Sequence, residues 1–321
     1  MSQQEVRAAN RFVQGLLRKR DRPLLVAHRG ASAFAPENTL DAAALGLASG
    51  ADAWELDVRL TRDEVAIVIH DATLTRTTDV ATRFRRDPRG ESGYLVADFT
   101  ADEIRTLDAG SWFVGNEAAP RSARWFGTAD VLDPEARAIY SSGAVRIPTL
   151  QECLSWTAAR DWLVNIEIKS CPGTSRQLVP TVLAEIESVA AADRILISSF
   201  DHHDVARVAR CAAPIATGVL SSLRLHNPGR YVREIVEADC YHPSAEALGV
   251  NPIPSDPDAV VESVWSDDLR SLRDFSVPVL YYTVNDCRPG GWADRLDRAG
   301  IDALFTDDPL GMVRFFNSRK P

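Results

Sequence analysis

Histidine and arginine side chains stand at the ends of apolar stretches of this chain. His28 and Arg29 follow four apolar residues at 24–27, and His70 follows the apolar stretch 65–69. Polar and charged groups are costly to bury without a partner, so neither residue type suits the interior of a strand. At the carboxyl end of a strand, however, such a side chain can point into a functional site. We therefore expect His28, Arg29 and His70 to lie where strands reach a site.

Two further apolar stretches carry charged residues two positions apart. Glu55 and Asp57 form one such pair, and Glu167 and Lys169 form the other. Residues i and i+2 of a strand point to the same face of the sheet, so Glu55 and Asp57 share a face. Neighbouring acids repel each other unless a cation neutralises them, and hard divalent metal ions prefer carboxylate oxygens. The alternative is that one acid of the pair faces solvent or pairs with Arg59.

These residue types fit the cleavage of a phosphoester when they converge on one site. Carboxylates can hold Mg²⁺ or Ca²⁺ with positions left open for substrate. Histidines exchange protons near neutral pH, and an arginine can contact two phosphate oxygens at once. The expected metal ligands are Glu55, Asp57 and Glu167, the expected acid and base are His28 and His70, and the expected phosphate contacts are Arg29 and Lys169.

Apolar runs that alternate with helix-like segments predict the fold that brings these residues together. Alternating strands and helices are typical of parallel βα units, and eight units favour a closed (β/α)8 TIM barrel over an open sheet. In such a barrel the carboxyl ends of the strands meet at one face, where active sites form. The candidate strands are 24–29, 53–60, 65–70, 162–169, 194–200, 214–221, 238–244, 277–284 and 302–308, and the main candidate helices are 38–50, 175–192, 201–213, 257–275 and 288–300.

Residues 72–148 interrupt this alternation with turn residues, charges and only short helical pieces such as 100–107. The segment is too long for a plain loop. We expect it to be an insertion that covers the barrel mouth, within a single domain of residues 1–321. Trp112 and Phe113 either contact the leaving group of a substrate or, more simply, pack the insertion onto the barrel.

The composition excludes several classes of function. The chain has 321 residues and a formal net charge of −9, which argues against a nucleic-acid partner held by general electrostatic attraction. No apolar stretch approaches the roughly 20 residues of a membrane span, and residues 1–22 lack the apolar segment of a signal peptide. The five cysteines form no CxxC pair, so free thiols in a reducing compartment are expected. We therefore expect a cytoplasmic protein without stable membrane insertion that acts on a small-molecule phosphodiester, and the sequence leaves its oligomeric state open.

The order of several short motifs is similar to that of the glycerophosphodiester phosphodiesterase family. The motifs are AHRG (27–30), PENT (36–39), ELDV (55–58), IHD (69–71), NIEIK (165–169), SSF (198–200) and TVND (283–286), and the resemblance covers residues 24–312. A lone HRG or HD would be unspecific, whereas this ordered set is specific. The residue before TVND, usually Trp in the family, is Tyr282 here, and this difference concerns the wall of the pocket rather than its chemistry.

The resemblance implies a fold, a site and a reaction. The implied features are a βα barrel with a segment inserted after the second strand region, catalytic histidines at His28 and His70, one divalent cation at Glu55, Asp57 and Glu167, and phosphate contacts at Arg29 and Lys169. The implied reaction is hydrolysis of glycerophosphodiesters to sn-glycerol 3-phosphate and an alcohol. In it the 2-hydroxyl of glycerol attacks phosphorus, one histidine takes its proton, and the other histidine protonates the leaving alcohol. Glu37 of PENT is an acid behind the site or the N-terminal residue of a helix, or else it has a purely structural role.

Two other functions remain open from the sequence. A lysophospholipase D cleaves similar esters that carry long acyl chains, and the insertion could supply the apolar groove that it needs. A non-catalytic phosphodiester-binding protein would have lost a histidine or a metal ligand, and none is missing here. His242, at a strand end before Pro243, is a weaker candidate for the border of the pocket, whereas His202 and His203 are expected to cap a helix or lie on the surface.

Overall fold

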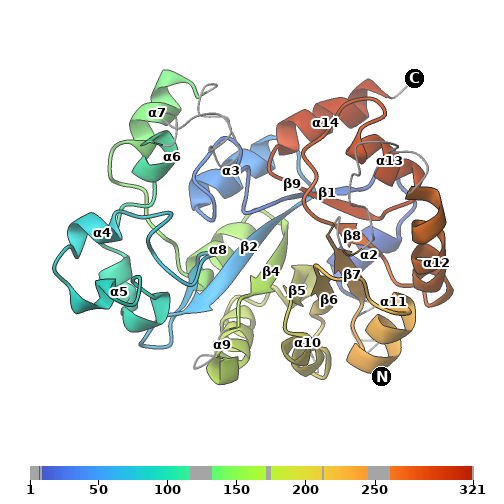
Figure 1. Ribbon diagram of the computed structural model, residues 1–321, viewed down its shortest axis with the longest axis horizontal. Helices are drawn as coiled ribbons and strands as arrows, with labels where there is room; N and C mark the ends of the chain where they lie inside the picture. Colours follow the sequence, from blue (N-terminus) through green and yellow to red (C-terminus); the bar gives the residue numbers. More distant parts are fainter. Residues whose placement is uncertain are drawn as a thin grey trace.

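The strands of the computed structural model belong to one sheet at the centre of the molecule, with helices placed around it (Figure 1). The structure describes residues 7, 9–115, 132–170, 175–211, 213–244, 247 and 261–319. The strands are β1 (Leu24–Ala27), β2 (Ala53–Leu60), β3 (Ala66–Val68), β4 (Leu163–Ile168), β5 (Ile195–Ser199), β6 (Ala216–Ser221), β7 (Cys240–Pro243), β8 (Leu280–Tyr281) and β9 (Ala303–Thr306). Each lies within one of the nine stretches expected from the sequence.

Eight of these strands form the wall of a barrel. They are neighbours in the order β7–β6–β5–β4–β2–β1–β9–β8, and every pair in this path is parallel. A parallel bridge between Tyr241 and Val279 joins β7 to the segment that leads into β8. The backbone N–H of Tyr241 also donates to the carbonyl of Pro278 at 2.9 Å. The sheet therefore returns on itself, and the expected (β/α)8 TIM barrel is confirmed.

Several predicted elements differ in extent or partner. β3 pairs antiparallel with β2, so the stretch 65–70 is a hairpin partner of β2 and not a strand of the barrel wall. The predicted strand 277–284 is reduced to the two residues of β8. The predicted helix 257–275 corresponds to a helix that begins at Val261, and residues 257–260 lie outside the described residues.

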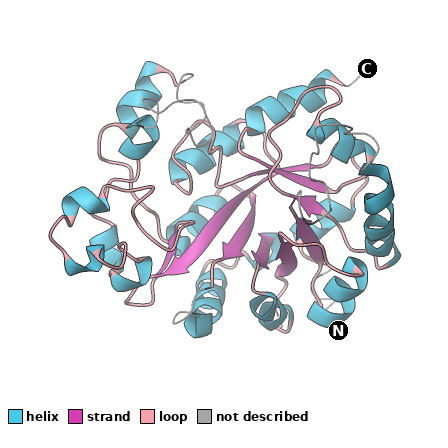
Figure 2. Ribbon diagram, in the orientation of Figure 1, coloured by secondary structure: helices cyan, strands magenta, loops and turns pink. Residues whose placement is uncertain are grey.

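The helices cover the outside of the barrel between successive strands (Figure 2). Those that follow or precede barrel strands are α2 (Arg11–Leu17), α3 (Leu40–Ala48), α8 (Leu150–Ala158), α9 (Ser175–Ser188), α10 (His202–Ala209), α11 (Pro228–Arg230), α12 (Val261–Asp274), α13 (Trp292–Arg298) and α14 (Pro309–Ser318). Two further helical turns, η6 (Ala192–Arg194) and η7 (Tyr231–Val236), precede β5 and β7. Among the described residues, no helix has the length and apolar character needed to cross a membrane.

The barrel interior is apolar at the amino ends of the strands. Phe12 and Leu16 of α2 are buried there among inward-facing side chains of most barrel strands. Asn10 caps α2 by accepting the backbone N–H groups of its first turn. The same side chain donates to the backbone carbonyls of Ile195 and Pro214 at 2.9 and 2.7 Å. Helix α2 therefore closes this end of the barrel.

The side chains two positions further along the same strands are polar. In β1 the inward-facing Val26 is followed on the same face by His28, and in β2 Ala53 is followed by Glu55 and Asp57. The two-residue period of a strand thus carries each charged group into the barrel at its carboxyl end. The interior changes from an apolar floor to a polar layer over the length of one strand.

The segment predicted as an insertion, residues 72–148, lies between β3 and α8. Its described part holds α4 (Val80–Arg83), η1 (Pro88–Gly90), η2 (Val96–Asp98), α5 (Ala101–Ile104), α6 (Ser111–Gly115) and α7 (Pro134–Tyr140). Figure 1 shows these elements gathered on one side of the barrel, beyond β2. They share a cluster of buried apolar side chains with Ile67 and Ile69 at the end of the β2–β3 hairpin. Phe113 is buried in this cluster and packs edge-to-face on Tyr140, with ring centroids 5.9 Å apart, so Phe113 is a packing residue.

Gly218 of β6 makes room in the barrel for a buried histidine. A Cβ atom at position 218 would lie only 2.4 Å from Nε2 of His242. The histidine ring or the β6 backbone would have to move to relieve this clash. We expect Gly218→Ala to lower the free energy of unfolding by about 1–3 kcal/mol, because it overpacks a filled interior. Denaturant unfolding followed by circular dichroism measures this. Gly115→Ala is the matched control, since no atom of the described residues lies within 4 Å of its added Cβ, and equal stability of the two variants would contradict the expectation.

Candidate active site

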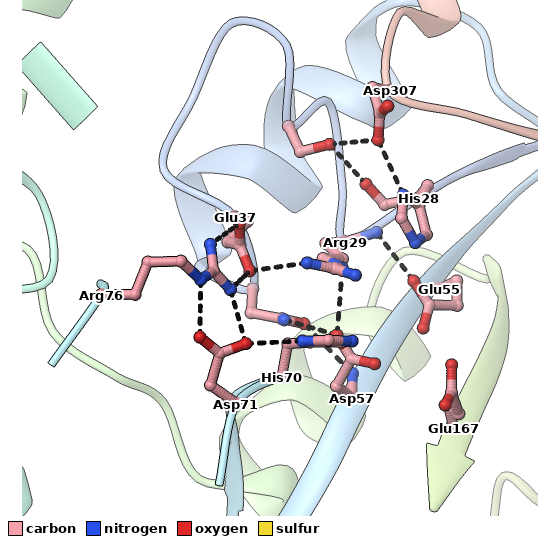
Figure 3. Close-up of polar contacts among 12 residues, drawn as sticks. His28, Arg29, Glu37, Glu55, Asp57, His70, Asp71, Arg76, Glu167 and Asp307 are labelled. Carbon is pink, nitrogen blue, oxygen red and sulfur yellow. Dashed lines mark hydrogen bonds and ion pairs between the residues drawn. The ribbon is translucent and has the colours of Figure 1, made fainter. Parts of the chain in front are cut away.

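A sharp turn at the end of β1 brings two consecutive residues to the polar layer. β1 ends at Ala27, two residues earlier than predicted, and Arg29 and Gly30 both have positive φ angles, 54° and 81°. A Cβ at position 30 would lie 2.5 Å from the backbone of Ala42, so only glycine fits there. The turn lets His28 continue the inward face of β1 while Arg29 reaches the same site from the side (Figure 3). The turn at Arg29 and Gly30 therefore brings the side chain of Arg29 to the site that His28 reaches from β1.

The three predicted metal ligands come together as a buried cluster. Glu55, Asp57 and Glu167 are 2%, 0% and 8% exposed, and each offers a carboxylate oxygen within 4.8 Å of the others. Glu55 Oε2 accepts the backbone N–H of Arg29 at 2.8 Å, whereas Glu55 Oε1 is buried without a hydrogen-bond partner. Lys169 contacts both Asp57, at 3.0 Å, and Glu167. The three acids therefore form one cluster, and Lys169 lies at its edge.

The electrostatics of this cluster leave one carboxylate without enough positive charge. Burial raises the pKa of Glu55 to about 8, and the neighbouring Asp57 adds to the effect. Burial would also raise the pKa of Asp57, but Lys169 and Arg29 hold it well below its usual value. A divalent cation among these oxygens would satisfy the orphaned oxygen of Glu55 and favour its ionised form. All three donors are hard carboxylate oxygens, so the residues present fit Mg²⁺ or Ca²⁺.

Asn38 fixes the position of Asp57 in the acidic cluster. Its Nδ2 donates to Asp57 Oδ2 at 2.8 Å, and its Oδ1 accepts the backbone N–H of Asp57 at 3.1 Å. Asn38 has a φ of 59°, a left-handed conformation that asparagine adopts more readily than most residues. The asparagine of PENT therefore fixes a metal-ligand candidate, a role that the sequence analysis did not assign.

The two predicted catalytic histidines are both held through Nδ1 by a carboxylate. His28 Nδ1 lies 2.7 Å from Asp307 Oδ1, and His70 Nδ1 lies 2.7 Å from Asp71 Oδ1. An ionised carboxylate can only accept, so in each pair Nδ1 carries the proton. Nε2 of each ring is then the atom available for proton exchange with a substrate.

Asp307 is itself fixed at the end of β9. Asn285 Nδ2 donates to its Oδ2 at 2.5 Å, and the Ser32 hydroxyl donates to its Oδ1 at 2.9 Å. Burial and Arg29 would lower the pKa of His28, but the charge and hydrogen bond of Asp307 outweigh them and raise it. The sequence analysis missed Asp307, although the residue stands at the end of a predicted strand, as His28 does.

Glu37 lies behind the site and is not the N-terminal residue of a helix. Helix α3 is capped by Thr39, which accepts the backbone N–H of Ala42. Glu37 is buried and accepts hydrogen bonds from Arg29 and from Arg76. Arg76 was missed by the sequence analysis, because it lies in the insertion, where no periodicity indicates which side chains point inward.

His242 and Tyr282 border the deepest part of the site. A cavity of about 20 Å³ lies between His28, Glu55, Asn165, Glu167, Ser198, Leu220, His242, Tyr282 and Phe305. His242 is fully buried, and burial lowers its pKa to about 3, so it stays neutral. The expectation that His242 borders the pocket is confirmed. His202 instead contacts the hydroxyl of Tyr231 and the carbonyl of Leu220, both at 2.8 Å, which is a packing role.

The Asp307 contact makes a prediction for the titration of His28. Because a neighbouring negative charge favours the imidazolium form, His28 should titrate above the usual value of about 6.5 in the metal-free protein, and Asp307→Asn should move its midpoint downward. The ring-proton chemical shift of His28, followed by NMR against pH, measures this. Asp297→Asn removes a carboxylate that pairs with Arg319 and serves as the control. Identical His28 midpoints in wild type and Asp307→Asn would contradict the assignment.

Comparisons with solved structures agree with the fold. The structure of a phosphodiesterase from Oleispira antarctica, in complex with the product sn-glycerol-3-phosphate, is 24% identical, covers 92% of this chain and 97% of that chain, and has a TM-score of 0.68. A glycerophosphodiester phosphodiesterase from Thermotoga maritima is 22% identical, covers 92% of this chain and 99% of that chain, and has a TM-score of 0.61. These likenesses concern the arrangement of the barrel and its helices.

Comparisons of sequence identify the family. The chain is 33% identical to the uncharacterized protein YqiK of Bacillus subtilis, over 89% of this chain and 95% of the relative. It is 32% identical to a glycerophosphodiester phosphodiesterase of Caldanaerobacter subterraneus, over 90% of this chain and 96% of the relative. The model of the glycerophosphoryl diester phosphodiesterase family matches residues 28–310, from the first site histidine to the start of α14. The chain therefore belongs to the glycerophosphoryl diester phosphodiesterase family, whose members are phosphoric diester hydrolases.

Proposed function

We propose that this chain hydrolyses glycerophosphodiesters to sn-glycerol 3-phosphate and an alcohol, with the help of one divalent cation. The observation that carries the proposal is the pair of histidines, each held through Nδ1 by a carboxylate, beside a buried cluster of three acids. The relative from Oleispira antarctica binds sn-glycerol-3-phosphate as its product, which supports the same product here.

The site residues divide into groups that bind and groups that move protons. Glu55, Asp57 and Glu167 would hold the cation, which when bound supplies positive charge for the phosphoryl oxygens. Arg29 and Lys169 add positive charge at the edge of the acidic cluster. Preorganised charges of this kind stabilise the negative charge that develops on a phosphoryl group in the transition state.

The two histidines complete the reaction. Nε2 of one histidine takes the proton of the glycerol 2-hydroxyl as its oxygen attacks phosphorus, and Nε2 of the other gives a proton to the departing alcohol. This first step breaks the bond from phosphorus to the alcohol and leaves a cyclic glycerol phosphate. Water then opens the ring to sn-glycerol 3-phosphate, while the same two histidines exchange their roles. The carboxylates of Asp307 and Asp71 stabilise whichever ring carries the additional proton.

A substrate panel distinguishes this proposal from its alternatives. Glycerophosphocholine, glycerophosphoethanolamine and glycerophosphoinositol should be hydrolysed with Mg²⁺ or Ca²⁺, and lysophospholipids should be poorer substrates. Release of the alcohol and of sn-glycerol 3-phosphate can be measured by coupled enzymatic assays. A preference for lysophospholipids would instead support a lysophospholipase D, and binding of every ester without turnover would support a non-catalytic binding protein.

Removal of one metal ligand should abolish activity. Glu55→Gln keeps the size of the side chain but weakens cation binding, because it removes one of three carboxylates. We expect loss of bound metal, measured by mass spectrometry of the purified protein, together with loss of turnover and a normal circular dichroism spectrum. Glu91→Gln, the same change at an exposed position, should keep both. Full wild-type activity in excess chelator, with no metal in the purified protein, would refute the role of the cluster.

Removal of the first histidine should lower turnover rather than affinity. General acid–base catalysis is worth about 10²–10⁴-fold, so His28→Ala should lower kcat by at least that order with little change in KM. Steady-state kinetics on the best substrate of the panel measures both constants. His203→Ala, at an exposed position of α10, is the control. Near-normal turnover of His28→Asn would leave His70 as the only proton carrier and disprove the role of His28.

A further inference from the structure

Arg76, at the start of the insertion, lies between two carboxylates of the site (Figure 3). Its Nε and Nη2 donate to Asp71 Oδ2 and Oδ1 at 2.6 and 3.0 Å. Its Nη1 and Nη2 donate to Glu37 Oε2 and Oε1, both at 2.7 Å. One guanidinium group thus makes two double-pronged contacts, with acids 34 positions apart in the sequence.

Each of these acids holds one proposed site residue on its other side. Asp71 Oδ1, which accepts from Arg76, also accepts from His70 Nδ1 at 2.7 Å. Glu37 Oε1, which accepts from Arg76, also accepts from Arg29 Nη1 at 2.9 Å. Arg76 is therefore linked to His70 through Asp71 and to Arg29 through Glu37.

Only arginine can make this set of contacts. Its nitrogens lie in one rigid plane, and two edges of that plane each match the spacing of a carboxylate. A lysine would keep the positive charge but could place only one nitrogen between Glu37 and Asp71. The position therefore depends on the shape of the side chain as well as on its charge.

The environment explains why these acids require Arg76. Burial alone would raise the pKa of Glu37, but the hydrogen bonds of Arg76 and the charge of Arg29 hold it below its usual value. Burial acts in the same direction on Asp71, whose pKa is also held low by hydrogen bonds from His70 and Arg76. The indole ring of Trp112 in α6 lies 5.9 Å from the guanidinium carbon, so the insertion also covers this contact.

We propose that Arg76 is a positioning residue of the active site: it fixes the ring of His70 through Asp71 and the guanidinium of Arg29 through Glu37. This inference rests on the proposed function, because it assigns Arg76 a part in the same reaction. The insertion thereby takes a direct part in arranging the site, in addition to any effect on the choice of leaving group.

Arg76→Lys tests the proposal, with a matched control in the same insertion. Misplacement of reacting groups by about 1 Å can cost about 10²-fold, so kcat should fall by roughly 10- to 100-fold, and by a larger factor than KM rises. Arg89 makes similar double contacts with Asp87 and Glu103, neither of which contacts a site residue. Arg89→Lys should therefore keep kcat within about threefold of wild type, and thermal unfolding shows whether both variants are folded.

A double-mutant cycle separates positioning from a general structural effect. If Arg76 acts through Asp71, then Arg76→Lys should lower kcat much less in the Asp71→Asn background than in wild type, because the link is already broken. The ¹⁵N spectrum of the His70 ring gives a readout without turnover. In the metal-free wild type the Nδ1–H tautomer should dominate, and in Arg76→Lys the two tautomers should mix. Arg76→Gln, which removes the charge, should show the same change if Arg76→Lys does not fold.

Three results would overturn the role of Arg76. They are a wild-type kcat in folded Arg76→Lys, an equal loss in Arg89→Lys, and fully additive losses with an unchanged His70 tautomer. Each leaves the proposed function intact as long as the wild-type protein hydrolyses glycerophosphodiesters. Failure of the wild type on the whole substrate panel, with either cation, would instead reject the proposed function.

Discussion

The site depends on the burial of three carboxylates at the end of a barrel with an apolar interior. Glu55, Asp57 and Glu167 repel each other in an environment of low polarity, and such a group is stable only when positive charge surrounds it. Arg29 and Lys169 provide two positive charges for three acids, and one oxygen of Glu55 keeps no partner. The remaining negative charge makes the cluster a place for a cation and, through that cation, for a phosphodiester.

The register between neighbouring strands brings the buried acids of the cluster together. Asp57 of β2 is the register partner of Glu167 in β4, so two acids from separate chain segments meet side by side. The same inward faces carry only apolar residues near α2, which closes the other end. The two-residue period of the strands places the acids above an apolar interior, and the turn at Arg29 and Gly30 then adds the basic group that the acids need. This explains why the acids are buried while the histidines, which stand beyond the strands, keep some exposure.

The parts that could be predicted from the sequence are those with a local pattern. Alternation of strands and helices indicated the barrel, and charged residues two apart or at strand ends indicated all seven proposed site residues. The second layer had no such pattern. Asp307 and Asn38 each contact a site residue that is far away in the sequence, so no local pattern indicates either contact. β8 is limited to Leu280–Tyr281, although the backbone N–H groups of Tyr282 and Val284 still donate to the carbonyls of Pro243 and Phe305 in the neighbouring strands.

The two histidines are supported by different parts of the chain, and this difference has a physical consequence. Asp307 holds His28 from the end of β9, and the side chains of this pair are only 12% and 1% exposed. Asp71 holds His70 from the position just before the insertion, and these side chains are 32% and 26% exposed. The His28 pair joins the ends of the neighbouring strands β1 and β9 and is largely shielded from water. The side chains of the His70 pair are partly open to water, which competes for their hydrogen bonds. Arg59 of β2 holds the backbone carbonyl of His70 at 2.8 Å, and the guanidinium of Arg76, anchored on the buried Glu37, ties the Asp71 side chain to the barrel. The contacts from His70 through Asp71 and Arg76 to Glu37 thus join the insertion to the barrel at the second histidine.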